Sequence, residues 1–436
     1  MIIMNYTSLL AGVNMKRKKY RGSCTKEMAY INYGTPLFRK TSIAFFAAGF
    51  NTFAILYCVQ PLMQEFSSEF KLSATMASLA LSVATICLAV SMLLFGSLSE
   101  VWGRKPVMVA SMLVASILCL LTAFSANYYY LLFLRALTGI VLAGVPSVAM
   151  AYLGEEMESK SLGKAMGLYI SGNAVGAMGG RIISGILSEF FSWHAAIGGI
   201  GVISIAATLS FALTLQPSRN FQARKLNMNV LGRSLINHLK DPGLLCLYGL
   251  GFLLLGSNVA LFNYIAYVLT SKPYSLQQGV VSWIFLLFII GMFSSIWIGR
   301  LVDRYGRHYI LIANLFLIII GALLTLHVGF LVWKIMGLAL TTFGFFGGHS
   351  IASGWVSQRA AANKAQASSL YLFLYYTGSS VGGTIGGVLW SHLGWSGIVI
   401  MVIAFTFIGI VLAAALLKIT GFTKPAAKSK QLHIFK

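Results

Sequence analysis

The chain has 436 residues, of which 58% are hydrophobic and only 10% are charged, and its mean hydropathy is +0.81. Soluble globular proteins carry about 25% charged residues, so the composition excludes that class and leaves no room for a sizeable soluble domain. About 250 apolar residues would fill about twelve membrane helices of about 20 residues each. We therefore expect an all-α integral membrane protein with twelve transmembrane helices.

Apolar segments alternate with short polar or glycine-containing breaks along most of the chain. The widest internal gap, 216–241, is basic and predicts a cytoplasmic linker between two six-helix bundles, residues 41–215 and 242–418. Residues 1–40 and 419–436 are expected to be cytoplasmic tails. The predicted spans are 41–63, 75–98, 106–123, 128–150, 162–190, 193–215, 242–270, 276–299, 309–328, 330–355, 366–391 and 395–418.

The N-terminal segment does not have the order of a secretory signal. A basic run from Lys16 to Lys19 follows a mildly apolar stretch instead of preceding it. Translation could begin at Met1, Met15 or Met28, and the sequence leaves these three starts open.

The formal net charge is +22, from 32 Lys and Arg against 10 Asp and Glu. In a soluble protein this excess would indicate nucleic-acid binding. With the N-terminus placed inside, 27 of the 32 basic residues fall on the cytoplasmic side, and only Lys71 and Lys272 fall outside. This asymmetry follows the positive-inside rule and predicts a multi-pass protein of the bacterial cytoplasmic (inner) membrane with both termini in the cytoplasm. The charge thus implies membrane lipid, and no nucleic acid, as a partner.

Two loops repeat one pattern, a glycine, an acidic residue four positions later, and Gly-Arg three positions further on. The first loop follows the second predicted span, the other follows the eighth, and the offset between them is 203 residues throughout. Because each element recurs six spans later, the halves form a parallel repeat rather than an inverted one. The pattern residues are Gly96, Glu100, Gly103 and Arg104 in the first loop and Gly299, Asp303, Gly306 and Arg307 in the second, and a second echo joins Gly172 and Gly176 to Gly378 and Gly382.

At these residues the sequence resembles the major facilitator superfamily over essentially all of 41–418. The loop after the second span is similar to the family's hallmark G-x-L-x-D-r-x-G-R-k-P, with Glu100 in place of the usual Asp. Arg135 with Gly139 in span four is similar to the family's membrane-buried arginine motif. The hallmark positions are occupied by Gly96, Leu98, Gly103, Arg104, Lys105 and Pro106.

Span five partly resembles the drug:proton antiporter pattern of the same superfamily, G-x8-G-xxx-G-P-xx-G-G. Ala177 replaces its proline and Arg181 replaces its last glycine. The resemblance implies a secondary transporter built from two six-helix bundles that alternate access across the membrane, and it favours proton-driven efflux. The matching glycines are Gly163, Gly172, Gly176 and Gly180.

The residue types in the two repeated loops indicate what these loops could do. Gly96 and Gly299 would let a helix end approach a neighbour closely. Glu100 and Asp303 can accept hydrogen bonds from the arginines of their loops, or lie against the positive N-terminus of an adjacent helix. We therefore expect these loops to form a gating motif at the cytoplasmic side. The alternative is that they only hold the loops and orient the protein.

Few charged or titratable side chains lie inside the predicted spans. Arg135 and Arg181 lie about 10 and 14 Å from the outer ends of their spans at 1.5 Å per residue. No Asp or Glu occupies the middle of any span, so we expect the two arginines to favour an anionic or carboxylate-bearing substrate. For Arg135, bracing the bundle through span-end carbonyls is the alternative. His349 is a candidate proton carrier because its ordinary pKa lies near neutrality, although a packing role is equally consistent with the sequence.

Uncharged polar residues offer two further candidates. Asn263 and Tyr267 are four residues apart in span seven and therefore share a face of the helix, where they are plausible substrate contacts. Asn51 and Gln60 in span one are nine apart and lie on opposite faces, so at most one of them can face a cavity.

The sequence contains no recognisable metal or cofactor motif. Five cysteines stand alone, with no CxxC pair and no Cys/His cluster, which argues against a disulfide framework and a zinc site. The glycine row from Gly378 to Gly387 superficially resembles a phosphate-binding loop. It lies inside an apolar helix and follows no strand, so close helix packing is expected there instead.

Three classes of function remain to compare. A secondary transporter of a small organic solute agrees with the two-half repeat and its paired loops. A membrane-embedded enzyme would need a catalytic constellation, and neither HExxH nor paired aspartates at span centres occur, so we expect no enzyme. A channel or receptor would not explain the paired loops. We expect proton-coupled efflux by antiport, with proton-coupled uptake by symport as the alternative, and as partners a small molecule, protons and lipid around a monomer.

Overall fold

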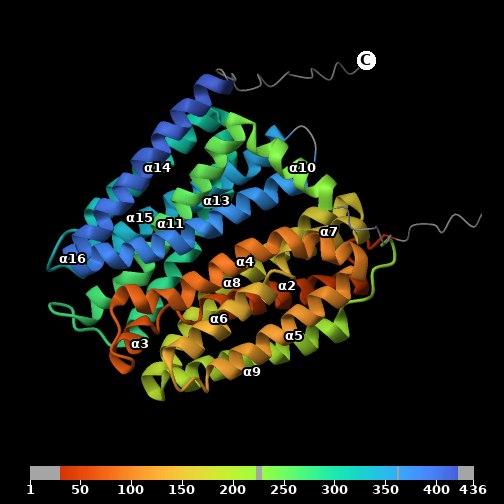
Figure 1. Ribbon diagram of the computed structural model, residues 1–436. Helices are drawn as coiled ribbons and strands as arrows, with labels where there is room; N and C mark the ends of the chain where they lie inside the picture. The colour runs from red at the N-terminus through yellow and green to blue at the C-terminus, as the bar shows by residue number, and fades with distance from the viewer. Residues whose placement is uncertain (1–29, 222–227, 361–362, 421–436) are drawn as a thin grey trace, which may run out of the picture.

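The computed structural model describes residues 30–221, 228–360 and 363–420 (Figure 1). The three candidate start methionines, most of both tails and part of the predicted linker lie outside these ranges. The described elements are helices, apart from one isolated bridge between Ile31 and Met157. The expected all-α fold class is confirmed.

The first half of the chain forms one group of helices, drawn in red to yellow-green in Figure 1. Thr35 begins the first of them as an N-cap, because its hydroxyl accepts a hydrogen bond from the Phe38 N–H, and proline follows at the first helical position. The helices of this half are α2 (Pro36–Tyr57), α3 (Met63–Glu69), α4 (Ala74–Trp102), α5 (Arg104–Thr122), α6 (Tyr128–Leu142), α7 (Pro146–Glu156), α8 (Ser159–Phe190) and α9 (Trp193–Thr214).

The second half forms the other group, drawn in green to blue, and α10 precedes it in the linker (Figure 1). Gly394 has a φ of 58° and a non-helical backbone, so it divides the last long helix into two membrane-spanning parts. The elements are α10 (Met228–Leu239), α11 (Pro242–Thr270), α12 (Gln278–Ser282), η1 (Trp283–Leu286), α13 (Leu287–Tyr305), α14 (Arg307–Leu324), α15 (Leu331–Arg359) and α16 (Lys364–Thr420).

Twelve membrane crossings follow from these helices. Within the described residues, nine helical segments are long and apolar enough to cross a membrane by length and composition, and α6 with α7 and α12 with α13 count as single segments. The glycine-rich α8, the basic-ended α2 and the second part of α16 complete the twelve. The arrangement matches the expected twelve-helix fold of two six-helix bundles.

The first predicted span, 41–63, is not one continuous helix. α2 ends at Tyr57, residues 58–62 are turns, and α3 starts only at Met63. Pro61 explains the break, because a proline cannot donate a backbone hydrogen bond and it disfavours helix in the residue before it. The repeat partner of Pro61 in the second half is Tyr264, and α11 runs on to Thr270 without a break.

Glycine lets one pair of helices in each half pack at backbone distance. Added Cβ atoms at Gly172 and Gly176 of α8 would clash with the α2 backbone. Cβ atoms at Gly378 and Gly382 of α16 would likewise clash with the α11 backbone. The second sequence echo thus marks equivalent packing in both halves, and the glycine row of α16 serves close helix packing, as expected.

The two ends of the bundle differ in how the halves meet. We call the end that holds α3 the α3 end, and the end that holds the linker helix α10 the linker end. No cluster of hydrogen bonds comparable to that of the α3 end joins the halves at the linker end among the described residues. The hydrogen-bonded pairs near the α3 end are Gln60–Asn263, Gln64–Thr270, Ser67–Tyr267, Ser82–Ser380, Ser82–Thr384, Pro61–Gln278 and Glu189–Gly279.

Three of these pairs follow the sequence repeat. Gln60 and Asn263 are 203 residues apart, which is the repeat offset, so the pair joins equivalent positions of the two halves. The same offset relates Gln64 to Tyr267 and Ser67 to Thr270, and the two bonds Gln64–Thr270 and Ser67–Tyr267 are therefore reciprocal. The pseudo-twofold relation between the halves is thus preserved at the α3 end, which is closed in this conformation.

Candidate functional site

Arg181 lies on α8 where the two halves meet, and only 3% of it is exposed. The Cζ atom of its guanidinium lies 3.9 Å from the ring centroid of Tyr57, in its own half. The rings of Phe285 and Phe288, from the other half, have their centroids at 5.0 and 4.9 Å. Such cation–π contacts stabilise a desolvated cation. Arg181 is therefore held in an aromatic enclosure that both halves build.

The hydrogen bonds of Arg181 leave its charge without a counter-ion. Nη1 donates to the Ala177 carbonyl oxygen at 2.6 Å, and Nε donates to the side-chain oxygen of Gln60. No carboxylate forms an ion pair with Arg181 within the described part of the chain. A buried and unneutralised arginine attracts an anion, and the expected preference for an anionic substrate stays a prediction.

Arg135 has the opposite character. It is 1% exposed, and it donates to the backbone carbonyl oxygens of Ala80, Ile55 and Leu56 at 2.9, 3.0 and 2.6 Å. Two of these carbonyls belong to the last turn of α2, where the break at Pro61 removes their helical partners. The geometry therefore favours the alternative for Arg135, because this guanidinium braces the broken end of α2 and none of its three nitrogens remains open to a substrate.

His349 lies on α15 beside a cavity of about 310 Å³ at the linker end. Its Nδ1 lies 2.9 Å from the Tyr371 hydroxyl, and its ring centroid lies 4.5 Å from that of Tyr375. The phenol of Tyr375 also lies within electrostatic range of Arg181. His349 and Tyr371 line the cavity themselves, and its other lining residues are Ser353, Gly354, Ser357, Ser368 and Leu372.

The expected pair Asn263 and Tyr267 lies at the contact between the halves. Asn263 accepts from the side-chain nitrogen of Gln60 at 2.6 Å and is completely buried. The Tyr267 hydroxyl lies 2.8 Å from that of Ser67. In this conformation both residues close the α3 end, so neither faces an open cavity.

The two repeated loops fold alike, with one difference from expectation. Gly103 and Gly306 have φ values of 92° and 88°, a conformation that side chains rarely adopt, and each links two helices by a tight turn. The expected close approach at Gly96 and Gly299 is wrong for this conformation. A Cβ at Gly96 would meet its nearest neighbour, the Ser147 carbonyl, at 3.9 Å, and one at Gly299 would meet nothing within 4 Å.

The arginines of these loops pair with residues that the sequence analysis missed. Nη2 of Arg104 lies 2.6 Å from Glu155 at the end of α7, and Nη1 donates to Ser99 at 2.5 Å. Arg307 donates to Gln358 at the equivalent place in α15. Both pairs span 51 residues, so this contact is also repeated. The repeat offset could have revealed them, because Glu155 and Gln358 are 203 residues apart.

The acidic residues of the loops therefore do not pair with their own arginines here. Glu100 and Asp303 take part in no ion pair among the described residues. Asp303 is exposed and Glu100 is half-buried. The expected pairing of Glu100 with Arg104 is wrong for this conformation, because α7 presents Glu155 to the same guanidinium. Both carboxylates remain available to another partner.

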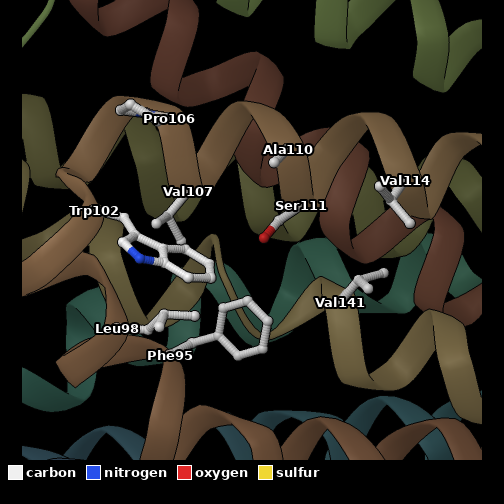
Figure 2. A pocket seen from close by; sticks show the side chains of 9 residues that line it. All are labelled: Phe95, Leu98, Trp102, Pro106, Val107, Ala110, Ser111, Val114 and Val141. Carbon is white, nitrogen blue, oxygen red and sulfur yellow. The ribbon is translucent and has the colours of Figure 1, made fainter.

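Two further hollows lie away from the arginine. Figure 2 shows an apolar pocket of about 460 Å³ between α4, α5 and α6, with the Trp102 indole at one side. All of its lining belongs to the first half, so it does not lie at the junction of the halves. A hollow of about 620 Å³ lies at the α3 end and contains Glu65. Burial raises the pKa of the Glu65 carboxyl, and the Ser188 hydroxyl, which donates to it, partly offsets that rise.

No group of three His, Cys, Asp or Glu side chains that could hold a metal ion occurs within the described residues. The cysteines of the described ranges, Cys58, Cys87, Cys119 and Cys246, are free thiols.

Comparison with known proteins places this geometry in a family. The family model for the Major Facilitator Superfamily matches residues 41–383 of this chain. YybF of Bacillus subtilis (strain 168), an uncharacterized transporter of the same type, is 64% identical over 86% of this chain and 93% of its own. The inner membrane transport protein YnfM of Escherichia coli (strain K12) is 43% identical over 91% and 93%. The multi-drug resistance efflux pump PmrA of Streptococcus pneumoniae is 26% identical over 81% and 90%.

Solved structures share the fold at low identity. A bacterial homologue of the human lysosomal transporter Spinster, in its inward-facing and unoccupied conformation, superposes with a TM-score of 0.69 at 14% identity, covering 88% of this chain and 96% of that one. The nucleoside transporter NupG superposes with a TM-score of 0.68 at 14% identity, covering 89% and 100%. With the match over 41–383 and the two close relatives, these findings establish that the chain belongs to the Major Facilitator Superfamily of membrane transporters.

Proposed function

We propose that this transporter moves a small organic anion across the cytoplasmic membrane by alternating access, coupled to protons. The observation that carries the proposal is Arg181, a buried cation without a counter-ion at the junction of the two halves. At an effective dielectric constant of 20, an anion at 4 Å gains about 4 kcal/mol from such a charge. The surrounding rings add contact area for an organic substrate, so a carboxylate attached to an apolar body fits best.

The orientation that we propose places the linker end in the cytoplasm. This placement follows from the distribution of basic residues and makes the closed α3 end the outer side. The conformation described above is then inward-open, and the cavity beside His349 opens to the cytoplasm. His349 and the half-buried carboxyl of Glu65 are the candidates for proton uptake on the two sides.

Efflux by antiport is the direction that we favour. The partial antiporter pattern in α8 supports it, and PmrA, a distant relative, bears the name of an efflux pump. Uptake by proton symport is the second candidate, because a transporter with one candidate proton site in each half can move its substrate either into or out of the cell. In the alternate conformation, Glu100 and Asp303 would hold the linker end closed by pairing with helix N-termini of the opposite half.

Ligand-induced thermal stabilisation of the purified protein in detergent tests the charge preference, because a ligand that binds the folded state raises its stability. We expect benzenesulfonate and phthalate to stabilise the protein, and tetraethylammonium and glucose to leave it unchanged. Arg181→Gln should lose the response to the anions, since one hydrogen bond from a charged donor contributes about 1.5–3 kcal/mol, or about 10- to 150-fold in affinity.

Arg39→Gln is the matched control, because this arginine is exposed at the start of α2. Its response should equal that of the wild-type protein. Stabilisation by tetraethylammonium alone would refute an anion site, as would an unchanged anion response in Arg181→Gln. Direction is measured separately in proteoliposomes of known sidedness, where an imposed proton gradient should drive the bound anion out of the compartment that represents the cytoplasm.

A further inference from the structure

Gln60 connects Arg181 to the contact between the halves. It is 1% exposed and lies in the break between α2 and α3. Its side-chain oxygen accepts from Arg181 Nε, and its side-chain nitrogen donates to Asn263 of the other half at 2.6 Å. Three buried side chains therefore form one continuous chain of hydrogen bonds across the junction of the halves.

The donors in this chain can point in only one direction. An arginine donates and never accepts, so Gln60 must present its oxygen to Arg181. The amide nitrogen of Gln60 then faces Asn263, which must accept with its oxygen. The remaining nitrogen of Asn263 is buried and has no hydrogen-bond partner in the described part of the chain. Asn263 is thus held through its oxygen by Gln60, and Gln60 is oriented by Arg181.

An anion would compete with Gln60 for the arginine. Nη1 donates to the Ala177 carbonyl one turn back on the same helix, whereas no carboxylate pairs with Nη2 among the described residues. A carboxylate or sulfonate binds a guanidinium best at two points. On the edge formed by Nε and Nη2, it must displace the Gln60 oxygen from Nε. Binding on this edge therefore breaks the first bond of the chain.

The hydrogen bond between Gln60 and Asn263 lies at a central point of the contact between the two halves. Gln60 and Asn263 occupy equivalent positions of the two halves, so their bond lies at the pseudo-twofold axis of the closed end. Gln60 lies in the break between α2 and α3, outside both helices, and its backbone N–H donates to the carbonyl of Tyr57 at the end of α2. The neighbouring bond between Ser67 and Tyr267 also joins the halves but does not involve an arginine.

We propose that Gln60 is a relay that couples Arg181 to the α3-end gate, so that an anion on Arg181 releases Gln60 from its oriented state and weakens the bond to Asn263. Gln60 is a positioning residue in this scheme. The anion part of the proposal rests on the proposed function, whereas the coupling of Arg181 to the gate through Gln60 does not.

The test measures opening of the α3 end directly. Ser282 is completely buried, and a Cβ on Gly185 of the other half would collide with its hydroxyl oxygen. In Ser282→Cys, a maleimide therefore reacts only when the halves separate at this end. The labelling rate is measured on purified full-length protein in detergent, after subtraction of the rate of protein without this substitution. Transport is not needed for the readout.

A double-mutant cycle then isolates the relay. Gln60→Leu should raise the labelling rate about 2- to 12-fold, the effect of losing one or more neutral hydrogen bonds. Arg181→Met should raise the rate in the wild-type background and raise it by a smaller factor in the Gln60→Leu background, where only its ring contacts with Phe285 and Phe288 are left to lose. In the control background Ser67→Ala, which removes a bond between the halves without contact to Arg181, the effect of Arg181→Met should keep its full size.

Equal effects of Arg181→Met with and without Gln60 would overturn the relay, and so would an absent effect in the wild-type background. Benzenesulfonate, added as the probe anion, should raise labelling in the wild-type and Ser67→Ala proteins and not in Gln60→Leu or Arg181→Met. If the cycle shows coupling but the anion changes nothing, the relay stands and the proposed anion substrate is refuted.

Discussion

Replacing Arg135 by methionine should destabilise the protein strongly. The substitution keeps an unbranched apolar side chain and removes three hydrogen bonds to the carbonyls of Ala80, Ile55 and Leu56. Bonds from a charged donor contribute about 1.5–3 kcal/mol each, which gives about 4.5–9 kcal/mol in total. Removing an arginine from the membrane interior also removes its insertion cost, which stabilises the variant by about 2.5–3.5 kcal/mol. The net loss of stability is therefore about 1–6 kcal/mol.

The assay is thermal unfolding of the purified protein in detergent, followed by intrinsic fluorescence. Arg135→Met should lower the unfolding temperature by several degrees, and Arg135→Lys should lie between it and the wild-type protein, because a single ammonium cannot reach all three carbonyls with the planar fork of arginine. Arg39→Met, at an exposed position, is the control and should change the temperature little. If Arg135→Met unfolds at the wild-type temperature, the brace at the broken end of α2 is not what holds that arginine in the membrane.

Three further outcomes are expected. Glu155→Gln should weaken the pair with Arg104 (2.6 Å) and change the transport rate at matched protein level by more than Glu158→Gln, a half-buried site without an ion pair among the described residues; equal rates in both would reduce the pair to a loop contact. At Asp241 burial raises the pKa, but the bonds from Arg359 and two backbone N–H groups outweigh it, so the net pKa is lowered and the carboxylate stabilises the fold above its unfolded pKa. Asp241→Asn should therefore lower the unfolding temperature at pH 7, and the difference from wild type should shrink as the pH falls below about 4; a difference that persists at low pH would refute the charge effect. A reporter that is active only outside the cytoplasm should stay silent when fused in 216–241, and activity there would invert the topology.

The fold class and the internal repeat could be predicted from the amino-acid sequence alone. Hydropathy and the lipid bilayer together require about twelve helices, because every backbone polar group in the membrane must be paired within its own helix. The offset of 203 residues, visible in two short loops, reappears in contacts as distant as Gln60–Asn263. Arg181 could be singled out because a charge inside an apolar span is rare and costly.

The partners of the two membrane arginines could not be predicted from the sequence, because they depend on how the helices pack. Backbone carbonyls are the partners of Arg135, and a carbonyl carries no sequence signature because every residue has one. Whether such a group is free depends on a helix end, here the break at Pro61, and on which neighbour packs against it. The partner of Arg104 was equally hidden, since Glu155 lies 51 residues away and meets it only because α7 packs beside α5. Local pattern and the solvent fix where helices form, whereas the pairing of buried charges is fixed by which helices touch.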